Sequence, residues 1–180
     1  TVANSKVFRG IYSSTGINTC AFTANNNNFQ NITYTGTGTG ECSMIYNGGT
    51  MASETIQGNT ITNLNINNTG TTYLFYISNA TLIVDFSNNN IVTGLTKSGA
   101  TSNASSLYGV YNFGSPAAGA NQNYYNNNFS NIVTNSTSAT LYGMYSALGT
   151  NTTSANYYNN TISSWNNNGN TGTIFGIYTS

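Results

Sequence analysis

The chain has 180 residues, only 3% of them charged, with three Lys or Arg, three Asp or Glu, no His and zero net charge. An ordinary soluble domain is about one quarter charged. With so few basic residues, the chain has no stripe that could neutralise phosphates, which excludes nucleic-acid binding by counterion release and polybasic attachment to a membrane surface.

No run of residues approaches the roughly 20 apolar positions that a membrane-spanning helix needs, so we expect no membrane insertion. The first residues show no charged segment followed by an apolar one, as in a processed mature chain or a piece of a longer one. The 14 Tyr and 8 Phe supply apolar surface to bury. We therefore expect residues 1–180 to fold as one domain rather than remain disordered.

A tyrosine closes a short apolar run six times, at intervals of 34, 30, 35, 34 and 33 residues. A fixed period of this length indicates repeating units that bury their apolar faces only by stacking on their neighbours. The period therefore predicts a solenoid. The six tyrosines are Tyr12, Tyr46, Tyr76, Tyr111, Tyr145 and Tyr178.

A second landmark falls between the tyrosines, where an asparagine stands two positions before a central Phe or Ile in all five repeats. Asparagine tolerates the left-handed backbone conformation, and its amide can donate and accept along the stacking direction. We predict a column of stacked amides at a repeated bend. Its members are Asn27, Asn59, Asn89, Asn127 and Asn160.

The apolar residues around each asparagine alternate or form short groups, without the sustained 3.6-residue period of a helix. Short strands separated by turn residues fit this pattern. We predict an all-β, right-handed parallel β-helix of about five coils, each of roughly 33 residues and three strands. One coil is longer and contains the only proline, so residues 114–120 are predicted to form a protruding corner loop.

These Gly-Ile-Tyr-like and Asn-Asn-x-Ile-like segments resemble the right-handed parallel β-helix repeats of large secreted bacterial surface proteins. The resemblance extends from about Phe8 to Tyr178. That family includes polysaccharide lyases, hydrolases, adhesins and passive stalks. The resemblance therefore implies a fold and an extracellular location, and it leaves the activity open.

Aromatic rings also recur three residues before the landmark tyrosine in the later coils. At the strand spacing of about 4.8 Å, such rings stack favourably along the axis. The favoured interpretation is a stabilising ladder, and the alternative is a sugar-binding strip. The two predicted columns contain Tyr73, Tyr108, Tyr142 and Phe175, and Tyr76, Tyr111, Tyr145 and Tyr178.

Small hydroxyl residues recur five and seven positions before the landmark tyrosines in Thr-x-Thr-like rungs, with Glu41 and Ala104 each replacing one hydroxyl. Turn-flanking β-branched residues explain them adequately, but a flat hydroxyl array would also suit an ice-binding face. The candidate binding residues are Thr39, Thr69, Thr71, Ser106, Ser138, Thr140, Thr171 and Thr173.

The two cysteines, Cys20 and Cys42, are 22 residues apart, which does not match the repeat. Two interpretations remain: a disulfide across the interior of a coil, or two buried apolar thiols. Neither implies catalysis, because no histidine or neighbouring base in the sequence would generate a thiolate.

Side chains that could serve in catalysis or metal binding are few in this sequence and do not cluster. Of the three acids, only Glu54 and Asp85 are spaced to approach one another on adjacent coils, and cleavage of a glycosidic bond calls for two flanking carboxyl groups. Without histidine, no metal site is predicted. We therefore expect no enzyme activity and no cofactor.

The leading hypothesis is a non-enzymatic structural solenoid at a bacterial cell surface, such as a stalk, filament or adhesin segment. It would self-associate or continue through open β-helix ends, and it could carry a glycan or host-surface ligand. The alternative is ice or carbohydrate binding through the hydroxyl or tyrosine columns. A polysaccharide lyase or hydrolase is the third hypothesis.

Overall fold

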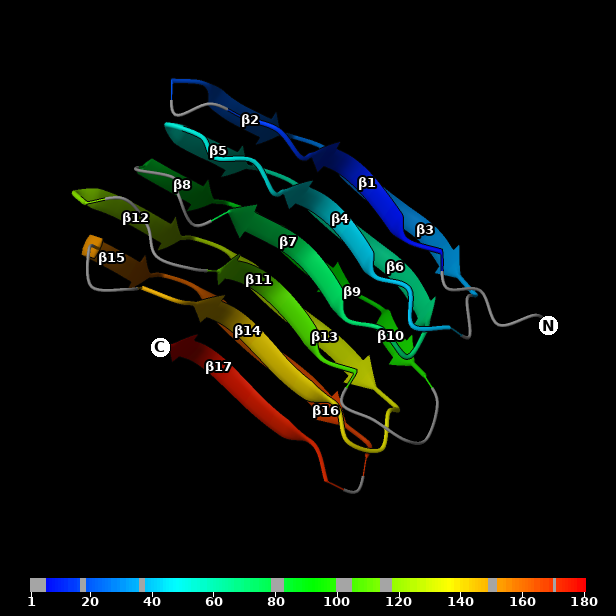
Figure 1. The fold of residues 1–180 in the computed structure, drawn as a ribbon. Helices are drawn as coiled ribbons and strands as arrows, with labels where there is room; N and C mark the ends of the chain where they lie inside the picture. The colour runs from blue at the N-terminus through cyan, green and yellow to red at the C-terminus, as the bar shows by residue number, and fades with distance from the viewer. Residues whose placement is uncertain are drawn as a thin grey trace.

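A computed structural model describes residues 6–16, 19–35, 38–78, 83–99, 105–113, 118–148, 152–169 and 171–180. Its strands form three sheets, and the chain visits the sheets in turn (Figure 1). Sheet A contains β1 (Phe8–Ser13), β4 (Cys42–Asn47), β7 (Thr72–Ser78), β11 (Leu107–Phe113), β14 (Thr140–Ser146) and β17 (Thr173–Thr179). Sheet B contains β2 (Ala21–Asn25), β5 (Ser53–Gln57), β8 (Ile83–Ser87), β12 (Ala120–Tyr125) and β15 (Thr152–Tyr158).

Sheet C completes each coil. It contains β3 (Asn28–Tyr34), β6 (Thr60–Asn67), β9 (Asn90–Thr93), β10 (Leu95–Ser98), β13 (Asn128–Thr134) and β16 (Thr161–Asn167). Neighbouring strands pair in parallel, so each pass of the chain lies directly on the previous one. The predicted all-β parallel solenoid is confirmed. The five strands of sheet B are separated by four steps, so the solenoid makes about four turns rather than the predicted five.

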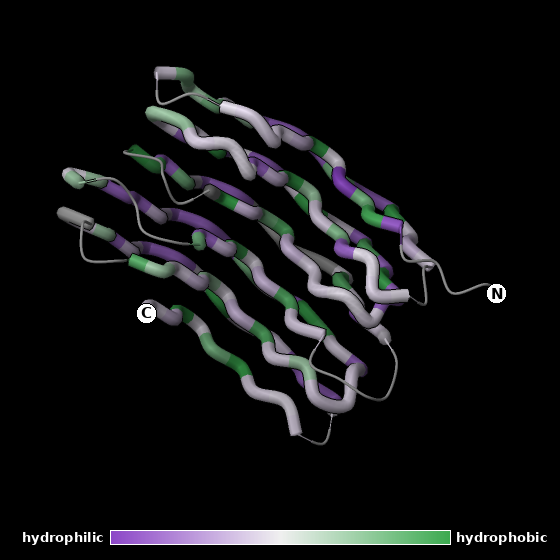
Figure 2. Tube along the Cα trace, in the orientation of Figure 1, coloured by the Kyte–Doolittle hydropathy of each residue, from purple (hydrophilic) through white to green (hydrophobic). Residues whose placement is uncertain are grey.

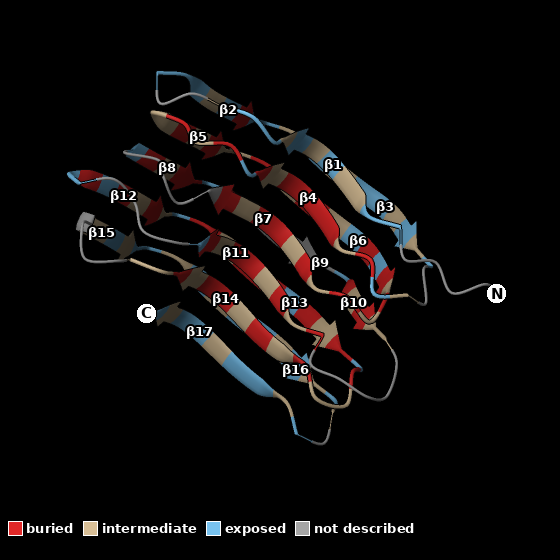
Figure 3. Cartoon of the chain, in the orientation of Figure 1, coloured by how far each residue is buried: buried red, intermediate tan, exposed pale blue. Residues whose placement is uncertain are grey.

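The core fills the space between the three sheets. Inward-facing side chains such as Phe75, Phe86 and Phe129 are fully buried, one from each sheet, and the Phe75 and Phe86 rings meet edge to face at 4.9 Å. Hydrophobic and hydrophilic positions follow one another closely along the strands (Figure 2). Burial is greatest in the middle coils and falls toward β1 and β17 (Figure 3).

Two columns of left-handed residues bend every coil at the same places. The first column lies between sheets B and C, and its residues have φ between 54° and 64°. It contains Asn26, Gly58, Asn88, Asn126 and Asn159. The second lies inside the sheet C passage and contains Asn31, Asn63, Gly94, Asn131 and Ser164. Glycine and asparagine occupy nine of these ten positions because they tolerate a positive φ at least cost.

The ladder asparagines themselves lie one residue after the first of these bends. We expected the left-handed conformation at the ladder position, and that expectation was wrong: the residue before it takes the positive φ. The physical reason is that the ladder residue needs its side chain to point along the solenoid axis. The preceding asparagine or glycine turns the backbone so that it can.

The five ladder asparagines form a continuous chain of hydrogen bonds. Asn89 donates its backbone N–H and its Nδ2 to Asn127 Oδ1, at 3.0 and 3.1 Å, and its Nδ2 also donates to Ile56 O at 2.9 Å. Its own Oδ1 accepts from the backbone N and the Nδ2 of Asn59, at 3.0 and 2.8 Å. Asn27 and Asn160 continue this pattern at the two ends. Each amide therefore joins neighbouring coils and satisfies a corner of the backbone.

The cysteines do not form a disulfide. Cys20 is an exposed free thiol just before sheet B, whereas Cys42 is a buried free thiol at the start of β4 in sheet A. Burial raises the pKa of Cys42 to about 12. The bridge is excluded because the two residues belong to different sheets in successive coils, and the alternative of two buried thiols fails for Cys20.

The predicted corner loop at 114–120 lies partly outside the described residues, which omit 114–117. Ala118 and Gly119 are exposed immediately before β12. Gly119 has a φ of 86°, and a Cβ added there would meet no atom within 4 Å.

Replacing Asn89 with Ala should lower the free energy of unfolding by about 1–3 kcal/mol, because the amides and carbonyls that it joins would remain buried without partners. Asn166, which is exposed on β16, is the matched control, and its replacement with Ala should change stability by less than about 0.5 kcal/mol. Urea denaturation of both variants measures the difference. Equal losses would contradict the ladder's role.

Candidate functional site

The outer face of sheet A carries an organised group of aromatic side chains that is partly open to solvent. Its tyrosines stand in two columns that run along the solenoid axis, and both columns keep strand register. In the first column Tyr108 lies opposite Tyr73 and Tyr142, and in the second Tyr111 lies opposite Tyr76 and Tyr145. Most of these rings are half-buried.

Most neighbouring rings in the same column stack face to face, whereas Tyr76 and Tyr111 are tilted by 35°. Tyr108 and Tyr142 have centroids 4.7 Å apart and planes 2° apart, and Tyr111 and Tyr145 are 5.1 Å and 19° apart. The columns end with Tyr142 on Phe175 and Tyr145 on Tyr178, at 5.2 and 5.3 Å. Stacked aromatic pairs of this kind add about 0.5–1.5 kcal/mol beyond the burial of their area.

Rings of the two columns meet edge to face within a coil. Tyr73 and Tyr76 are 84° apart in plane, and Tyr142 and Tyr145 are 87° apart. Because neighbouring coils cover the faces of the inner rings, a ligand at the middle of the strip can reach only ring edges and hydroxyls. This geometry favours the stabilising ladder over a platform on which sugar rings would stack.

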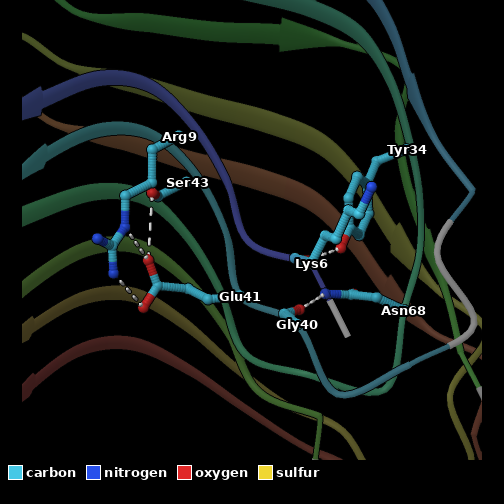
Figure 4. Close-up of polar contacts among 7 residues, drawn as sticks. All are labelled: Lys6, Arg9, Tyr34, Gly40, Glu41, Ser43 and Asn68. Carbon is cyan, nitrogen blue, oxygen red and sulfur yellow. Dashed lines mark hydrogen bonds and ion pairs between the residues drawn. The ribbon is translucent and has the colours of Figure 1, made fainter. Parts of the chain in front are cut away.

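An ion pair lies at the N-terminal end of the second column (Figure 4). Arg9 donates from Nε to Glu41 Oε1 at 3.0 Å, and its guanidinium lies 4.4 and 4.1 Å from the ring centroids of Tyr12 and Tyr46. Ser43 also donates to Glu41 at 3.4 Å. Arg9 therefore covers this end of the tyrosine column with a cation–π contact. Nothing in the sequence spacing had indicated this arrangement.

The predicted hydroxyl rungs lie partly in sheet A and partly in the turns that precede it. Thr140 and Thr173 face one another on β14 and β17, and Thr71 and Ser106 come directly before β7 and β11. The remaining four lie in the turns that lead into sheet A, so they belong to no strand: Thr39, Thr69, Ser138 and Thr171. Each predicted rung therefore spans the start of sheet A, with one hydroxyl in or beside a strand and the other in the preceding turn. Backbone hydrogen bonds from Thr69 N to Gly38 O and from Thr171 N to Thr137 O join these turns between coils. A flat hydroxyl face stays a prediction.

The two acids expected to approach one another lie on opposite faces of sheet B. Glu54 pairs with Val84 and is fully buried, whereas Asp85 pairs with Thr55 and accepts a hydrogen bond from Gln57 Nε2 at 2.9 Å. Neighbouring positions in a strand point to opposite faces, and the register puts the two carboxyl groups one position out of step. The part of the chain that the structure describes contains no group of three or more His, Cys, Asp or Glu able to hold a metal.

Lys97 is buried inside the solenoid, which the sequence had not indicated. Its Nζ donates to Asn68 Oδ1, Gly70 O and Thr72 Oγ1, at 2.7, 2.8 and 3.0 Å. Asn68 in turn donates to Gly40 O at 2.6 Å, and on the same side of the solenoid Tyr34 donates to the Lys6 carbonyl (Figure 4). Burial lowers the pKa of Lys97 to about 8. These contacts satisfy all three donors of the ammonium group, so its role is structural.

No protein-family model, curated protein or solved structure matches this chain. Among the residues that the structure covers, no helix is long and apolar enough to cross a membrane. Because no relative indicates a function, we base the proposals below on three features of the structure: the outer face of sheet A, the asparagine ladder and the two ends of the solenoid.

Stability should rise with pH above about 8 and then fall in stronger alkali. Lys97 holds its proton less tightly in the fold, with a pKa of about 8 against 10.5 unfolded, so stability increases across that interval. Burial raises the pKa of Tyr76 and Tyr108 to about 12 from 10.0, and that of Cys42 to about 12 from 9.0. The unfolded chain loses these protons first, so stability decreases above pH 9 to 10.

Lys97→Met is the matched variant for this pH dependence, and urea denaturation from pH 7 to pH 11 is the measurement. Between pH 8 and 10 the free energy of unfolding of the original chain should gain about 2 kcal/mol relative to the variant. The alkaline decrease should remain in both proteins. Parallel curves over the whole range would show that Lys97 does not titrate as a buried amine.

Proposed function

We propose that this chain is part of a non-enzymatic structural solenoid at a bacterial cell surface, a stalk, filament or adhesin segment that is extended through its open ends. The observation that carries the proposal is the exposure of core positions at the last strand. Ile174 and Ile177 on β17 lie opposite Leu141 and Met144 on β14. The two isoleucines are 42% and 47% exposed, whereas their partners are at most 1% exposed.

The same loss of burial occurs at the other end of the solenoid. There Phe8 and Ile11 on β1 face the core but are only partly buried (Figure 3). At the C-terminal end, Ile162 and Trp165 on β16, the last strand of sheet C, are partly buried in the same way as the isoleucines of β17. Exposed apolar positions at the edge of a parallel sheet favour the addition of further strands. Another coil placed on either end would bury these side chains in the way that the inner coils already do.

The asparagine ladder requires that any further coil be added head to tail, in the same orientation along the axis. Each ladder asparagine donates to the Oδ1 of the next one toward the C-terminus, from Asn27 to Asn160. Asn160 at one end therefore presents donors along the axis, and Asn27 at the other presents an Oδ1 acceptor. A coil that carries the same asparagine continues the ladder at either end in the same head-to-tail sense.

The scarcity of charged side chains supports a passive, structural role. One ion pair, Arg9 with Glu41, is present among the described side chains, and neutral amides and hydroxyls provide the polar surface. A rod of this kind is held by hydrogen-bonded ladders and stacked rings, which depend little on salt. This property suits a protein exposed to variable conditions outside the cell, and the extracellular location is part of the proposal.

Ile177→Lys should weaken end-to-end association, because a charge would have to be buried at the joint between coils. Phe113→Lys is the matched control: Phe113 is 48% exposed, like Ile177, but lies at the end of β11 within the stack. Size-exclusion chromatography and electron microscopy should show concentration-dependent rods for the original chain and the control. The Ile177 variant should associate about tenfold less tightly or worse. Compact particles that do not associate at any concentration would contradict the proposal.

A second candidate function is binding of a flat, neutral glycan along the outer face of sheet A. It is favoured by the tyrosine columns, which have the Thr140–Thr173 hydroxyl column beside them. Ring edges and hydroxyls would supply hydrogen bonds, since the ring faces are covered. A glycan array is the test. Binding that is lost in Tyr108→Ala but retained in Tyr158→Ala, on the outer face of sheet B, would support it, and an array without any bound glycan would eliminate it.

A further inference from the structure

The tyrosine columns hold pairs of phenols from neighbouring coils in contact while leaving them partly open to solvent. Tyr108 and Tyr142 are stacked at 4.7 Å, Tyr111 and Tyr145 at 5.1 Å, and all four are half-buried. The same columns hold three more stacked phenol pairs: Tyr46 with Tyr76 at 4.2 Å, Tyr73 with Tyr108 at 5.3 Å, and Tyr145 with Tyr178 at 5.3 Å. Tyr125 and Tyr158 are stacked on the outer face of sheet B at 4.9 Å, with planes 4° apart. The two tyrosines of each pair are between 30 and 35 residues apart in the sequence, which is one coil.

We infer that these stacked pairs are sites of dityrosine cross-linking, formed between neighbouring coils by a one-electron oxidant of the peroxidase class acting with hydrogen peroxide. The inference does not depend on end-to-end association, because each bond forms within one chain. It concerns a covalent modification that would reinforce the rod described above.

The chemistry needs no group beyond the two phenols and the oxidant. Each tyrosine gives one electron to the oxidant and one proton to water, which leaves two phenoxyl radicals. The radicals couple through one ring carbon next to each hydroxyl. The hydrogens on those two carbons then move, through solvent, to the oxygens, which restores both phenols. One hydrogen peroxide accepts the two electrons and two protons and becomes two water molecules.

The stacking geometry selects which tyrosines can couple. Face-to-face rings place the π lobes of their ring carbons toward one another, which is the overlap that the new carbon–carbon bond requires. Tyr108 and Tyr111 in the same coil are as close, at 4.6 Å, but their planes are 68° apart. Tyr142 and Tyr145 are 87° apart. Edge-to-face contacts lack that overlap, so bonds should form between coils and not within a coil.

The chain also contains internal controls for access and for chemistry. Tyr124 and Tyr157 are stacked at 4.9 Å with planes 7° apart, but the Tyr124 ring is buried in the core, out of reach of a protein oxidant. Tyr142 also stacks on Phe175, which has no phenol and cannot form the radical. If proximity alone decided coupling, Tyr124 and Tyr157 would also cross-link. If coupling requires two accessible phenols, they should not.

The experiment treats the dilute folded protein with a heme peroxidase and hydrogen peroxide, followed by peptide mass spectrometry and dityrosine fluorescence. We expect loss of two hydrogen atoms per bond and cross-linked peptides that join Tyr108 to Tyr142, Tyr111 to Tyr145, and Tyr125 to Tyr158. The stacked pairs Tyr46–Tyr76, Tyr73–Tyr108 and Tyr145–Tyr178 should give the corresponding peptides. Tyr142→Phe preserves the stack and should remove the first peptide only. A mixture of ¹⁵N-labelled and unlabelled chains distinguishes bonds within a chain from bonds between chains.

The cross-linked fraction should melt roughly 5–15 °C above the untreated protein, because each bond closes a loop of about one coil in the unfolded state. An unchanged melting temperature would overturn the reinforcing role. Bonds found mainly between Tyr108 and Tyr111 or between different chains would overturn the geometric selection. The whole inference would fail if free tyrosine added to the same reaction coupled while the protein did not.

Discussion

The hydrogen-bonded asparagine ladder is the interaction on which the rest of the structure depends. Strand pairing alone permits neighbouring coils to slip, because a parallel ladder of backbone hydrogen bonds is the same at each repeat along the strand. The ladder amide removes this freedom, since Asn89 must meet both Asn127 and the carbonyl of Ile56. Once that corner is fixed, equivalent residues lie over one another in every sheet.

The tyrosine columns are a consequence of this fixed register. Their rings stack because the ladder holds successive coils at the same phase, and the left-handed residue before each ladder asparagine sets the direction of the next strand. The same stacking limits what the face can do. Covered ring faces cannot receive a sugar ring, whereas accessible phenol pairs are well placed for a reaction with each other.

Several polar side chains inside the solenoid find hydrogen-bond partners there, although single atoms such as Asn112 Oδ1 and Gln122 Nε2 remain without one. Lys97 binds two carbonyl-type oxygens and one hydroxyl, and Asn112 donates to Gln122 Oε1 and Tyr124 Oη at 2.9 and 2.8 Å. A buried ammonium without such acceptors would be costly. With them, a chain that has almost no charged surface can still place a basic residue in its core.

The sequence by itself determined the period, the β-solenoid and the membership of the main columns, because fixed register converts equal spacing along the chain into vertical contact. Members of the columns such as Asn59 and Asn89 could therefore be identified from the sequence alone. Only the tertiary structure decided which asparagine of each pair bends the backbone, because both residues of a pair such as Asn88 and Asn89 suit either role. It also decided that the tyrosine rings turn their faces to one another, because ring orientation depends on individual side-chain torsions that the spacing of the repeat does not encode. The opposite directions of Glu54 and Asp85, in contrast, follow from the local interval of 30 residues between Asn59 and Asn89, which places Glu54 opposite Val84 and Asp85 one position out of step.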